Sequence, residues 1–304
     1  MTLMDEFTSR LFREAEETLK EEPELEMLLN RTVLAKDVES FEDAVASTVC
    51  YRLLLHPPCN RKDIVGGDNP SDSMFCPNML NLLLRRAFAN ESILEAGYTM
   101  KESVRQDAKA VIDRDPACNS LLEVVLFFKG FAALVCHRAA RQKWISSKSG
   151  RSMTALFLQS QASAMFSVDI HPGATIGAGI MLDHGTGVVI GETAKVGDGC
   201  TFLHGVTLGG TGKDHGDRHP KVGTKVLIGA GASVLGCINI GSRSKIGAGS
   251  IVLRDIPPGA TAGNRCLFFT MKIANGTILL KFLFHFGSWR TSQNHWTRTG
   301  RRSS

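Results

Sequence analysis

An aliphatic residue recurs at every sixth position through the centre of the chain. A half-buried strand repeats every two residues and a helix every 3.6, so neither element explains this spacing. A six-residue period is typical of a β-helix whose triangular coils each contain three hexads, about eighteen residues. The positions that keep the period are Ile170, Ile176, Leu182, Val188 and Val206, then Ile190, Val196, Phe202 and Leu208 in a second phase, and Val222, Ile228, Val234, Ile240, Ile246 and Val252.

Two irregularities interrupt this repeat. The phase slips by two residues between Val188 and Ile190. Farther along, residues 209–221 are polar and rich in glycine, so they cannot fill a coil, and we expect them to leave the β-helix as an extruded loop. Loops that extend from a rigid scaffold are common places for binding and catalytic residues.

The residues on either side of the repeat follow other patterns. In residues 1–164, apolar side chains recur at spacings of three and four, which predicts helices. Proline, glycine and polar residues at about 57–78 predict an insertion-like surface loop between these helices. We therefore expect an α+β protein: an N-terminal α-helical domain, a left-handed parallel β-helix over 165–258, and an atypical basic C-terminal tail over 259–304.

Charge and cysteine content narrow the class of protein. The net charge is +5, but the chain from Arg265 onward holds seven Lys or Arg and no acid, so the first 264 residues carry a net charge of −2. A nucleic-acid-binding protein needs basic residues clustered on a folded face, so we expect no nucleic-acid partner. The first 40 residues are acidic, unlike a targeting peptide, and the 8 cysteines form no C-x-x-C pair. Both features favour a cytoplasmic protein whose cysteines are reduced thiols.

Asp169 and His184 are candidates for proton transfer. Asp169 precedes the first hexad, and His184 follows fifteen residues later, which is close to one coil. Because strands of adjacent coils stack about 4.8 Å apart, Asp169 can reach His184 from a neighbouring coil. A carboxylate that holds one imidazole nitrogen leaves the other free to accept a proton near neutral pH. On spacing alone, an unrelated surface Asp and His remain the alternative.

Other charged residues suit the two ends of an amino acid. Arg218 and His219 lie in the predicted loop, Asp183 is next to His184, and Asp115 belongs to the helical region. A guanidinium binds a carboxylate in bidentate geometry, and carboxylates bind an ammonium group. The glycine-rich start of the loop can present backbone N–H groups to an oxyanion. A solvated loop of mixed charge is the competing interpretation.

Together these segments resemble serine O-acetyltransferase, a hexapeptide-repeat acyltransferase family that catalyses the first step of cysteine synthesis from serine. The resemblance is nearly continuous from about residue 100 to 264. The motifs that carry it are Asp113-Arg-Asp-Pro-Ala117, Lys129-Gly-Phe131, Asp169-Ile-His-Pro172, Gly179-Ile-Met-Leu-Asp-His-Gly-Thr-Gly187, Val189-Ile-Gly-Glu-Thr193, His204-Gly-Val-Thr-Leu-Gly-Gly-Thr-Gly-Lys213 and Gly216-Asp-Arg-His-Pro-Lys221.

The resemblance implies a chemical role for each candidate. His184 would take the proton of the serine hydroxyl, oriented by Asp169, while serine attacks acetyl-CoA directly, with acetyl-CoA as the co-substrate and no metal. The resemblance also implies a trimer or a dimer of trimers. Because cysteine carries the same ammonium and carboxylate as serine, we expect it to compete for the serine site as a feedback inhibitor. The remaining assignments are Asp115 and Asp183 for the substrate ammonium, Arg218 with His219 for its carboxylate, Gly210 for the oxyanion, and Ala230, Lys245 and Ala248 for the CoA arm.

The end of the sequence departs from that family. The family continues past Ala262-Gly-Asn264 into a Pro-Ala-Lys segment that contacts CoA, and it ends in an Ile that docks into O-acetylserine sulfhydrylase. Here Arg265-Cys-Leu-Phe-Phe follows, and the last residue is Ser304. We therefore expect weaker CoA binding and no stable complex with that sulfhydrylase. The tail is interpreted as a segment that packs against nothing, from an altered reading frame or splice, and an apolar extension that binds a partner or membrane surface is the alternative.

Three other functions remain open. A hexapeptide-repeat carbonic anhydrase would need three histidines on zinc, and the candidates are His184, His204, His215 and His219. Another acyl-CoA transferase would act on a sugar or an amine, and a panel of acceptors would distinguish it. A non-catalytic β-helix scaffold would bind neither serine nor acetyl-CoA.

Overall fold

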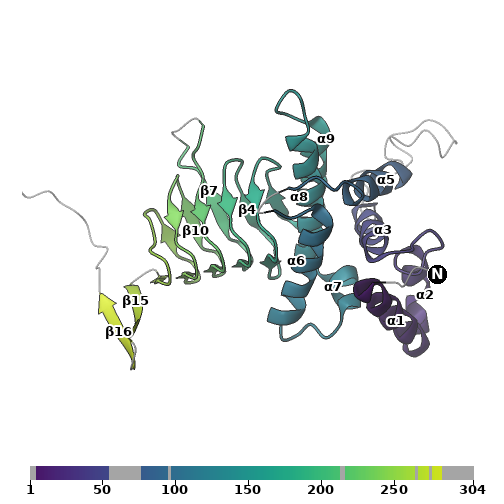
Figure 1. The fold of residues 1–304 in the computed structure, drawn as a ribbon, viewed down its shortest axis with the longest axis horizontal. Coiled ribbons are helices and arrows are strands. Elements are labelled where there is room, and N and C mark those ends of the chain that lie inside the picture. The colour runs from purple at the N-terminus through teal and green to yellow at the C-terminus, as the bar shows by residue number, and fades with distance from the viewer. Residues whose placement is uncertain are drawn as a thin grey trace, which may run out of the picture.

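The computed structural model describes residues 5–54, 77–94, 97–212 and 216–263, and the backbone of 266–273 and 276–282. Helices form one end of an elongated molecule, and a solenoid of short strands extends away from them (Figure 1). Within the part of the chain described, no helix is long and apolar enough to cross a membrane. The loop expected at about 57–78 falls almost wholly outside the described residues.

The helical region surrounds two central helices, α3 and α8. Both bury most of their side chains, including polar ones such as Glu42 on α3 and Arg138 on α8. The capping box of α6, Thr99 with Glu102, satisfies two of the four backbone N–H groups that are unpaired at a helix start. The elements are α1 (Glu6–Glu21), η1 (Pro23–Leu25), α2 (Glu26–Arg31), α3 (Phe41–Leu54), α5 (Pro77–Phe88), α6 (Met100–Arg114), α7 (Leu121–Phe127), α8 (Lys129–Ile145) and α9 (Met153–Phe166).

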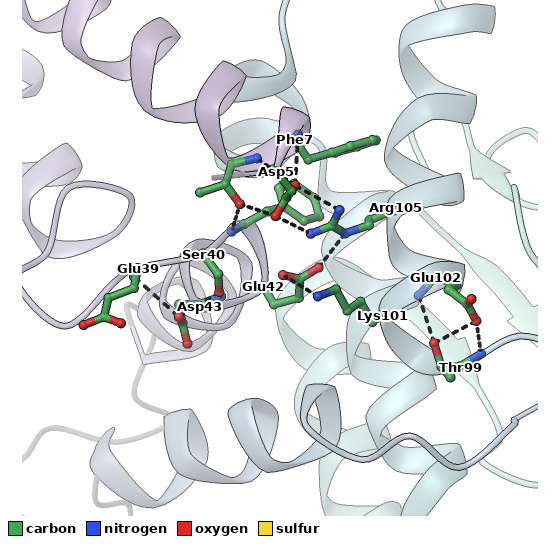
Figure 2. Close-up of polar contacts among 12 residues, drawn as sticks. Asp5, Phe7, Glu39, Ser40, Glu42, Asp43, Thr99, Lys101, Glu102 and Arg105 are labelled. Carbon is green, nitrogen blue, oxygen red and sulfur yellow. Dashed lines mark hydrogen bonds and ion pairs between the residues drawn. The ribbon is translucent and has the colours of Figure 1, made fainter. Parts of the chain in front are cut away.

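Arg105 on α6 ties the first turn of α1 to α3 (Figure 2). Its guanidinium donates to both oxygens of Asp5, at 3.0 and 3.1 Å, and to Oε1 of Glu42 at 2.6 Å. Asp5 also accepts the N–H groups of Phe7 and Thr8 and so caps α1. Partial burial opposes ionisation of Asp5, but the hydrogen bonds from Arg105 and Thr8 outweigh it and lower its pKa to about 2. Arg105 therefore links α6 to both α1 and α3.

The solenoid consists of three parallel sheets that meet at the corners of a triangle. Their orders are β1-β4-β7-β10-β13, β11-β8-β5-β2 and, from its solenoid end, β3-β6-β9-β12-β14. The strands are β1 (Val168–Ile170), β2 (Thr175–Ile176), β3 (Met181–Leu182), β4 (Val188–Ile190), β5 (Lys195–Val196), β6 (Thr201–Phe202), β7 (Thr207–Gly209), β8 (Lys221–Val222), β9 (Leu227–Ile228), β10 (Ser233–Leu235), β11 (Asn239–Ile240), β12 (Lys245–Ile246), β13 (Ile251–Val252) and β14 (Thr261–Gly263). The prediction of helices followed by a parallel β-helix is confirmed.

The strand register corrects the position of the phase slip. Met181 pairs with Thr201, a separation of twenty residues, whereas Val189 pairs with Thr207 at the regular eighteen. The two added residues therefore lie between Leu182 and Val189, in the turn that contains His184, and not between Val188 and Ile190. Val188 and Ile190 are both buried because they are the two ends of the three-residue strand β4, whose middle side chain faces outward.

The expected loop lies between β7 and β8. Lys195 pairs with Lys221, twenty-six residues away, so this coil holds eight residues more than the regular period. The surplus leaves the solenoid at the corner after β7 (Figure 1). Residues 213–215 of the loop lie outside the described residues.

A buried ion pair joins the helices to the first coil. Arg138 on α8 and Asp107 on α6 are 2% and 0% exposed, and their side chains meet in two hydrogen bonds of 2.7 and 2.8 Å. Arg138 also donates to the carbonyls of Ile176 and Gly177, and Asp107 accepts the N–H of Ile180. No coil precedes the first one, so these side chains satisfy backbone groups that another coil would otherwise pair.

The tail forms strands in the described backbone. Strand β15 (Cys266–Ile273) pairs antiparallel with β14 and with β16 (Gly276–Phe282), and the hairpin extends from the last coil (Figure 1). The expectation of a segment that packs against nothing is therefore wrong for its backbone. The exposed edge of the last coil offers unpaired N–H and C=O groups, which pair with another strand whatever its side-chain pattern.

Candidate active site

The turn of residues 183–187, between β3 and β4, carries two of the candidates. His184 has a φ of 55°, in the left-handed region, and its side chain is 76% exposed. Its Nε2 lies 3.7 Å from Oδ1 of Asp183, and its ring approaches that of His204 on the next coil with centroids 6.0 Å apart. His184 therefore faces outward, as expected, and its imidazole is open to a substrate.

Asp169 lies on the neighbouring strand β1, where it is half-buried. Its Oδ1 accepts a hydrogen bond of 2.7 Å from Nε2 of Gln159 on α9. The two side chains line an open hollow of about 510 Å³ beside α9. Asp169 and His184 both belong to the described residues, and no hydrogen bond or ion pair joins them. The carboxylate nearest to His184 is that of Asp183. Nothing in the sequence pattern had indicated Gln159.

A second group of candidates surrounds the turn between β4 and β5. Nη2 of Arg218 lies 3.0 Å from Oε2 of Glu192, and Nδ1 of His219 lies 2.8 Å from Oγ1 of Thr193. The same hydroxyl accepts the backbone N–H groups of Arg218 and His219. A Cβ on Gly210 would lie 3.3 Å from Cγ of Arg218, so the loop backbone packs against this side chain. Glu192 and Thr193 belong to a quoted motif, but sequence reasoning gave them no role.

His219 is held as a neutral imidazole. Burial, together with the nearby charges of Arg218 and Lys221, lowers its pKa below the usual value. The N–H of Thr193 donates to Nδ1 at 3.2 Å, so the hydrogen bonds assign the ring proton to Nε2. This ring can therefore donate one hydrogen bond without adding a positive charge.

The two groups occupy different corners of the solenoid. The turn of His184 precedes β4, and the turn of Glu192, which holds Arg218, follows it. The sheet β1-β4-β7-β10-β13 spans the distance between them, and Asp169 lies on that sheet. One chain therefore brings His184 together with Asp183, and Arg218 with His219, but it does not bring the two pairs together.

Asp115 ends α6 beside the solenoid. It is the C-cap of that helix, and its Oδ1 accepts the N–H of Ala117 at 2.9 Å. The preceding Arg114 donates to the carbonyl of Cys200 at 3.3 Å and to Oγ1 of Thr201 at 3.2 Å, so it ties the helix end to the second coil. In the described residues the structure gives Asp115 no direct polar contact with Asp183.

The expected CoA-binding alanines continue the corner that carries His184. The N–H of Gly231 donates to the carbonyl of His204, and that of Gly249 donates to the carbonyl of Ala230. Ala248 lies one coil beyond Ala230, so His184, His204 and the two alanines follow one another along a single edge. Lys245 is exposed on β12, on the sheet that leads into this corner.

The histidines considered for zinc are spread over these corners. His184 and His204 are neighbours, His219 is at the other corner, and His215 lies outside the described residues. Across the described ranges, no three His, Cys, Asp or Glu side chains gather as metal ligands would. Within the described residues of one chain, His184, His204 and His219 thus do not form a three-histidine site.

Comparisons with known proteins place the chain in a family. Residues 71–136 match the family model "Serine acetyltransferase, N-terminal". Serine acetyltransferase 4 of Arabidopsis thaliana is 44% identical over 228 residues, which are 75% of this chain and 62% of that protein. The chain thus spans somewhat less than two thirds of that relative.

Solved structures match over almost their entire length. Soybean serine acetyltransferase complexed with serine is 38% identical, with a TM-score of 0.72 over 90% of this chain and 97% of that one. Serine acetyltransferase in complex with Coenzyme A from Brucella abortus strain S19 is also 38% identical, with a TM-score of 0.72 over 92% of this chain and 97% of that one. From this similarity in sequence and in fold, the chain belongs to the serine acetyltransferase family.

Proposed function

We propose that this protein transfers the acetyl group of acetyl-CoA to the hydroxyl of L-serine, giving O-acetylserine and CoA. The observation that carries the proposal is the exposed imidazole of His184, held in a left-handed turn at the head of the edge that bears Ala230 and Ala248. The relatives solved with serine and with Coenzyme A support the same pair of substrates.

The proposed step uses His184 as a general base. Its imidazole takes the proton of the serine hydroxyl as the serine oxygen attacks the thioester carbonyl, and the backbone N–H of Gly210 would stabilise the resulting oxyanion. The attack forms the C–O bond; the oxyanion then re-forms the carbonyl, the C–S bond breaks, and the proton passes from His184 to the departing CoA sulfur. Asp169, half-buried on β1, would orient the imidazole.

Both ends of the amino acid have charged partners among the candidates. Asp115 and Asp183 would bind the ammonium group, and Arg218, with the Nε2–H of His219, would bind the carboxylate. Arg218 is paired with Glu192 in the free chain, so a substrate carboxylate would share or replace that partner. Charge-assisted pairs of this kind are about twice as strong as neutral hydrogen bonds.

We also propose that the complete site forms between two copies of the chain. The His184 and Arg218 groups lie at opposite edges of one sheet, so a single chain cannot enclose one serine molecule with both. A second copy packed on that sheet would bring its own Arg218 corner to the first copy's His184. Packing of this kind can close into a ring, and a ring of three copies would be the trimer expected from sequence.

Acetyl-CoA would lie along the corner that runs from His184 past His204. Small side chains at Ala230 and Ala248 leave room for the pantetheine arm, and the ammonium of Lys245, exposed on the adjoining sheet, would attract the CoA phosphates. This placement keeps the thioester at the His184 end.

The direct test is serine-dependent release of the CoA thiol by the purified full chain. We expect His184→Ala to lower kcat by about 10²–10⁴-fold. Lys225→Ala is the matched control, because Lys225 is also exposed, also non-glycine and also left-handed, with a φ of 56°, but lies at a different corner. Near-normal turnover of His184→Ala would refute the base assignment. Absence of thiol release from the wild type would favour the scaffold, and release with other acceptors only would favour another acyltransferase.

Mixed oligomers test the proposal that the site is shared. Assayed at low serine, co-expressed His184→Ala and Arg218→Ala chains should be more active than either variant alone, because about a quarter of randomly mixed interfaces join two intact corners. Sizing of the same sample reports the oligomer. A monomeric protein, or mixed oligomers without recovery, would contradict a site formed between copies.

A further inference from the structure

The first turn of α8 lies in backbone contact with the turn that carries His184. A Cβ on Gly130 would lie 2.2 Å from the carbonyl oxygen of Leu182 and 2.8 Å from its Cβ. In the opposite direction, a Cβ on Gly185 would lie 3.4 Å from Cα of Gly130. The two segments are therefore so close that no side chain fits at position 130.

Polar contacts hold the same turn on both sides. Nζ of Lys129, the residue before Gly130, donates a hydrogen bond to Oγ1 of Thr186. On the other side, the N–H of Gly187 donates to the carbonyl of Ser167, the C-cap of α9, at 2.7 Å. The turn of residues 183–187 is thus fixed between the start of one helix and the end of another.

The conformation of this turn explains why it needs external support. His184 is a non-glycine residue with a φ of 55°, and Gly185 and Gly187 are left-handed as well. Non-glycine residues in this region are strained, and they persist where the surrounding structure determines them. The turn also holds the two residues that the regular coils lack, so the solenoid repeat alone does not define its path.

We propose that Lys129 and Gly130 are positioning residues, which fix the His184 imidazole by holding the turn of residues 183–187 against α8. The inference rests on the proposed function, since it assigns no contact with substrate to either residue. It gives a role to the Lys129-Gly-Phe131 motif, for which the proposed chemistry has no use.

Replacing Gly130 tests the close contact. The Cβ of Gly130→Ala must move away from the Leu182 carbonyl by about 1 Å, and a displacement of that size costs about 10²-fold in kcat. Ala140→Gly, farther along α8, is the control for a weakened helix, and we expect a lower Tm with wild-type kcat. Alanine favours helix over glycine, so an effect on the helix alone would raise the Tm of Gly130→Ala and leave its kcat unchanged; that result would overturn the proposal.

Replacing Lys129 and Thr186 tests the hydrogen bond. Thr186→Val should lower kcat about tenfold while KM for both substrates changes by less than about twofold, and Thr186→Ser, which keeps the hydroxyl, should restore kcat. Lys129→Met should give a similar loss alone and little further loss in the Thr186→Val background. Lys143→Met, on the same helix and without a role in the proposal, is the charge control. Equal losses from Lys129→Met in both backgrounds would show that Lys129 acts elsewhere and would overturn its role.

The wild type separates this inference from the proposed function. A wild-type chain without serine-dependent thiol release would fail the proposed function before any variant is compared. An active wild type whose Gly130→Ala and Thr186→Val variants retain kcat would fail the positioning role alone.

Discussion

Removing Arg138 should loosen the joint between the helices and the solenoid. In Arg138→Met, the carboxylate of Asp107 stays buried without its cation, and the carbonyls of Ile176 and Gly177 lose their donor. Loss of one partner from a buried ion pair typically costs about 3–5 kcal/mol of unfolding free energy. For a chain of 304 residues that corresponds to a fall in Tm of roughly 5–8 °C.

Thermal unfolding followed by circular dichroism measures this loss against an exposed pair. Lys109 and Asp113 form an ion pair on α6 with side chains 66% and 51% exposed, so Lys109→Met should change the unfolding free energy by less than about 0.5 kcal/mol. The double variant Arg138→Met with Asp107→Leu should regain part of the loss, because no uncompensated charge remains buried. An Arg138→Met protein as stable as Lys109→Met would refute the structural role.

The same variant has a predictable response to pH. Burial raises the pKa of the Asp107 carboxyl, and the guanidinium of Arg138 opposes that rise. Without Arg138, the folded protein takes up this proton more readily than the unfolded chain. The stability gained from protonation is complete at low pH and is lost as pH rises, so the Tm deficit of Arg138→Met should shrink as pH falls from 7 towards 5.

Three further outcomes follow from the geometry. Burial, with the charges of Arg138 and Arg141, keeps the pKa of His137 well below 6.5. As pH falls below 6.5, the unfolded chain therefore binds a proton at His137 that the folded chain does not, which favours unfolding. His137→Phe should lessen the fall in Tm on acidification, and an unchanged dependence of Tm on pH would contradict this. A Cβ at Gly191 would lie 2.0 Å from Nε2 of His219. Gly191→Ala should therefore displace the imidazole ring and raise KM for serine. A wild-type KM would show that serine binding does not need this ring position. Arg218→Ala should weaken serine and cysteine together by about 1.5–3 kcal/mol in calorimetric titration; tight cysteine binding by that variant would place the inhibitor site elsewhere.

The hexad period predicted the solenoid because it records a repeated physical environment. Each aliphatic residue fills the same narrow interior in successive coils, as the burial of Ile190, Leu208 and Val234 illustrates. The extruded loop was predictable for the converse reason, since polar residues cannot take those places. The position of the two added residues could not be predicted, because Val188 and Ile190 are both apolar and both fit the hexad period. Only the pairing of the strands shows that the added residues precede Val188.

The pattern of apolar and polar residues could not predict which side chains from distant segments pair. Nothing periodic connects Asp107 with Arg138, or Gln159 with Asp169, and each pair is defined by how helices pack on the first coil. The separation of His184 from Arg218 was equally hidden, since motif order along a chain does not state which corner of a triangle each motif occupies. The backbone pairing of the tail depends on a free sheet edge rather than on hydrophobic spacing.

The eight-residue surplus between β7 and β8 has a consequence for how such a protein can diverge. The strands on both sides keep their register despite the surplus, so the scaffold does not fix the length of the loop. Doubling a flexible loop costs only about 0.6 kcal/mol in closure entropy. Insertions and deletions before Arg218 should therefore cost little folding free energy, whereas the turn of residues 183–187 is held by contacts on both sides. Related chains can thus differ in the length of this loop while the corner that carries His184 keeps its place.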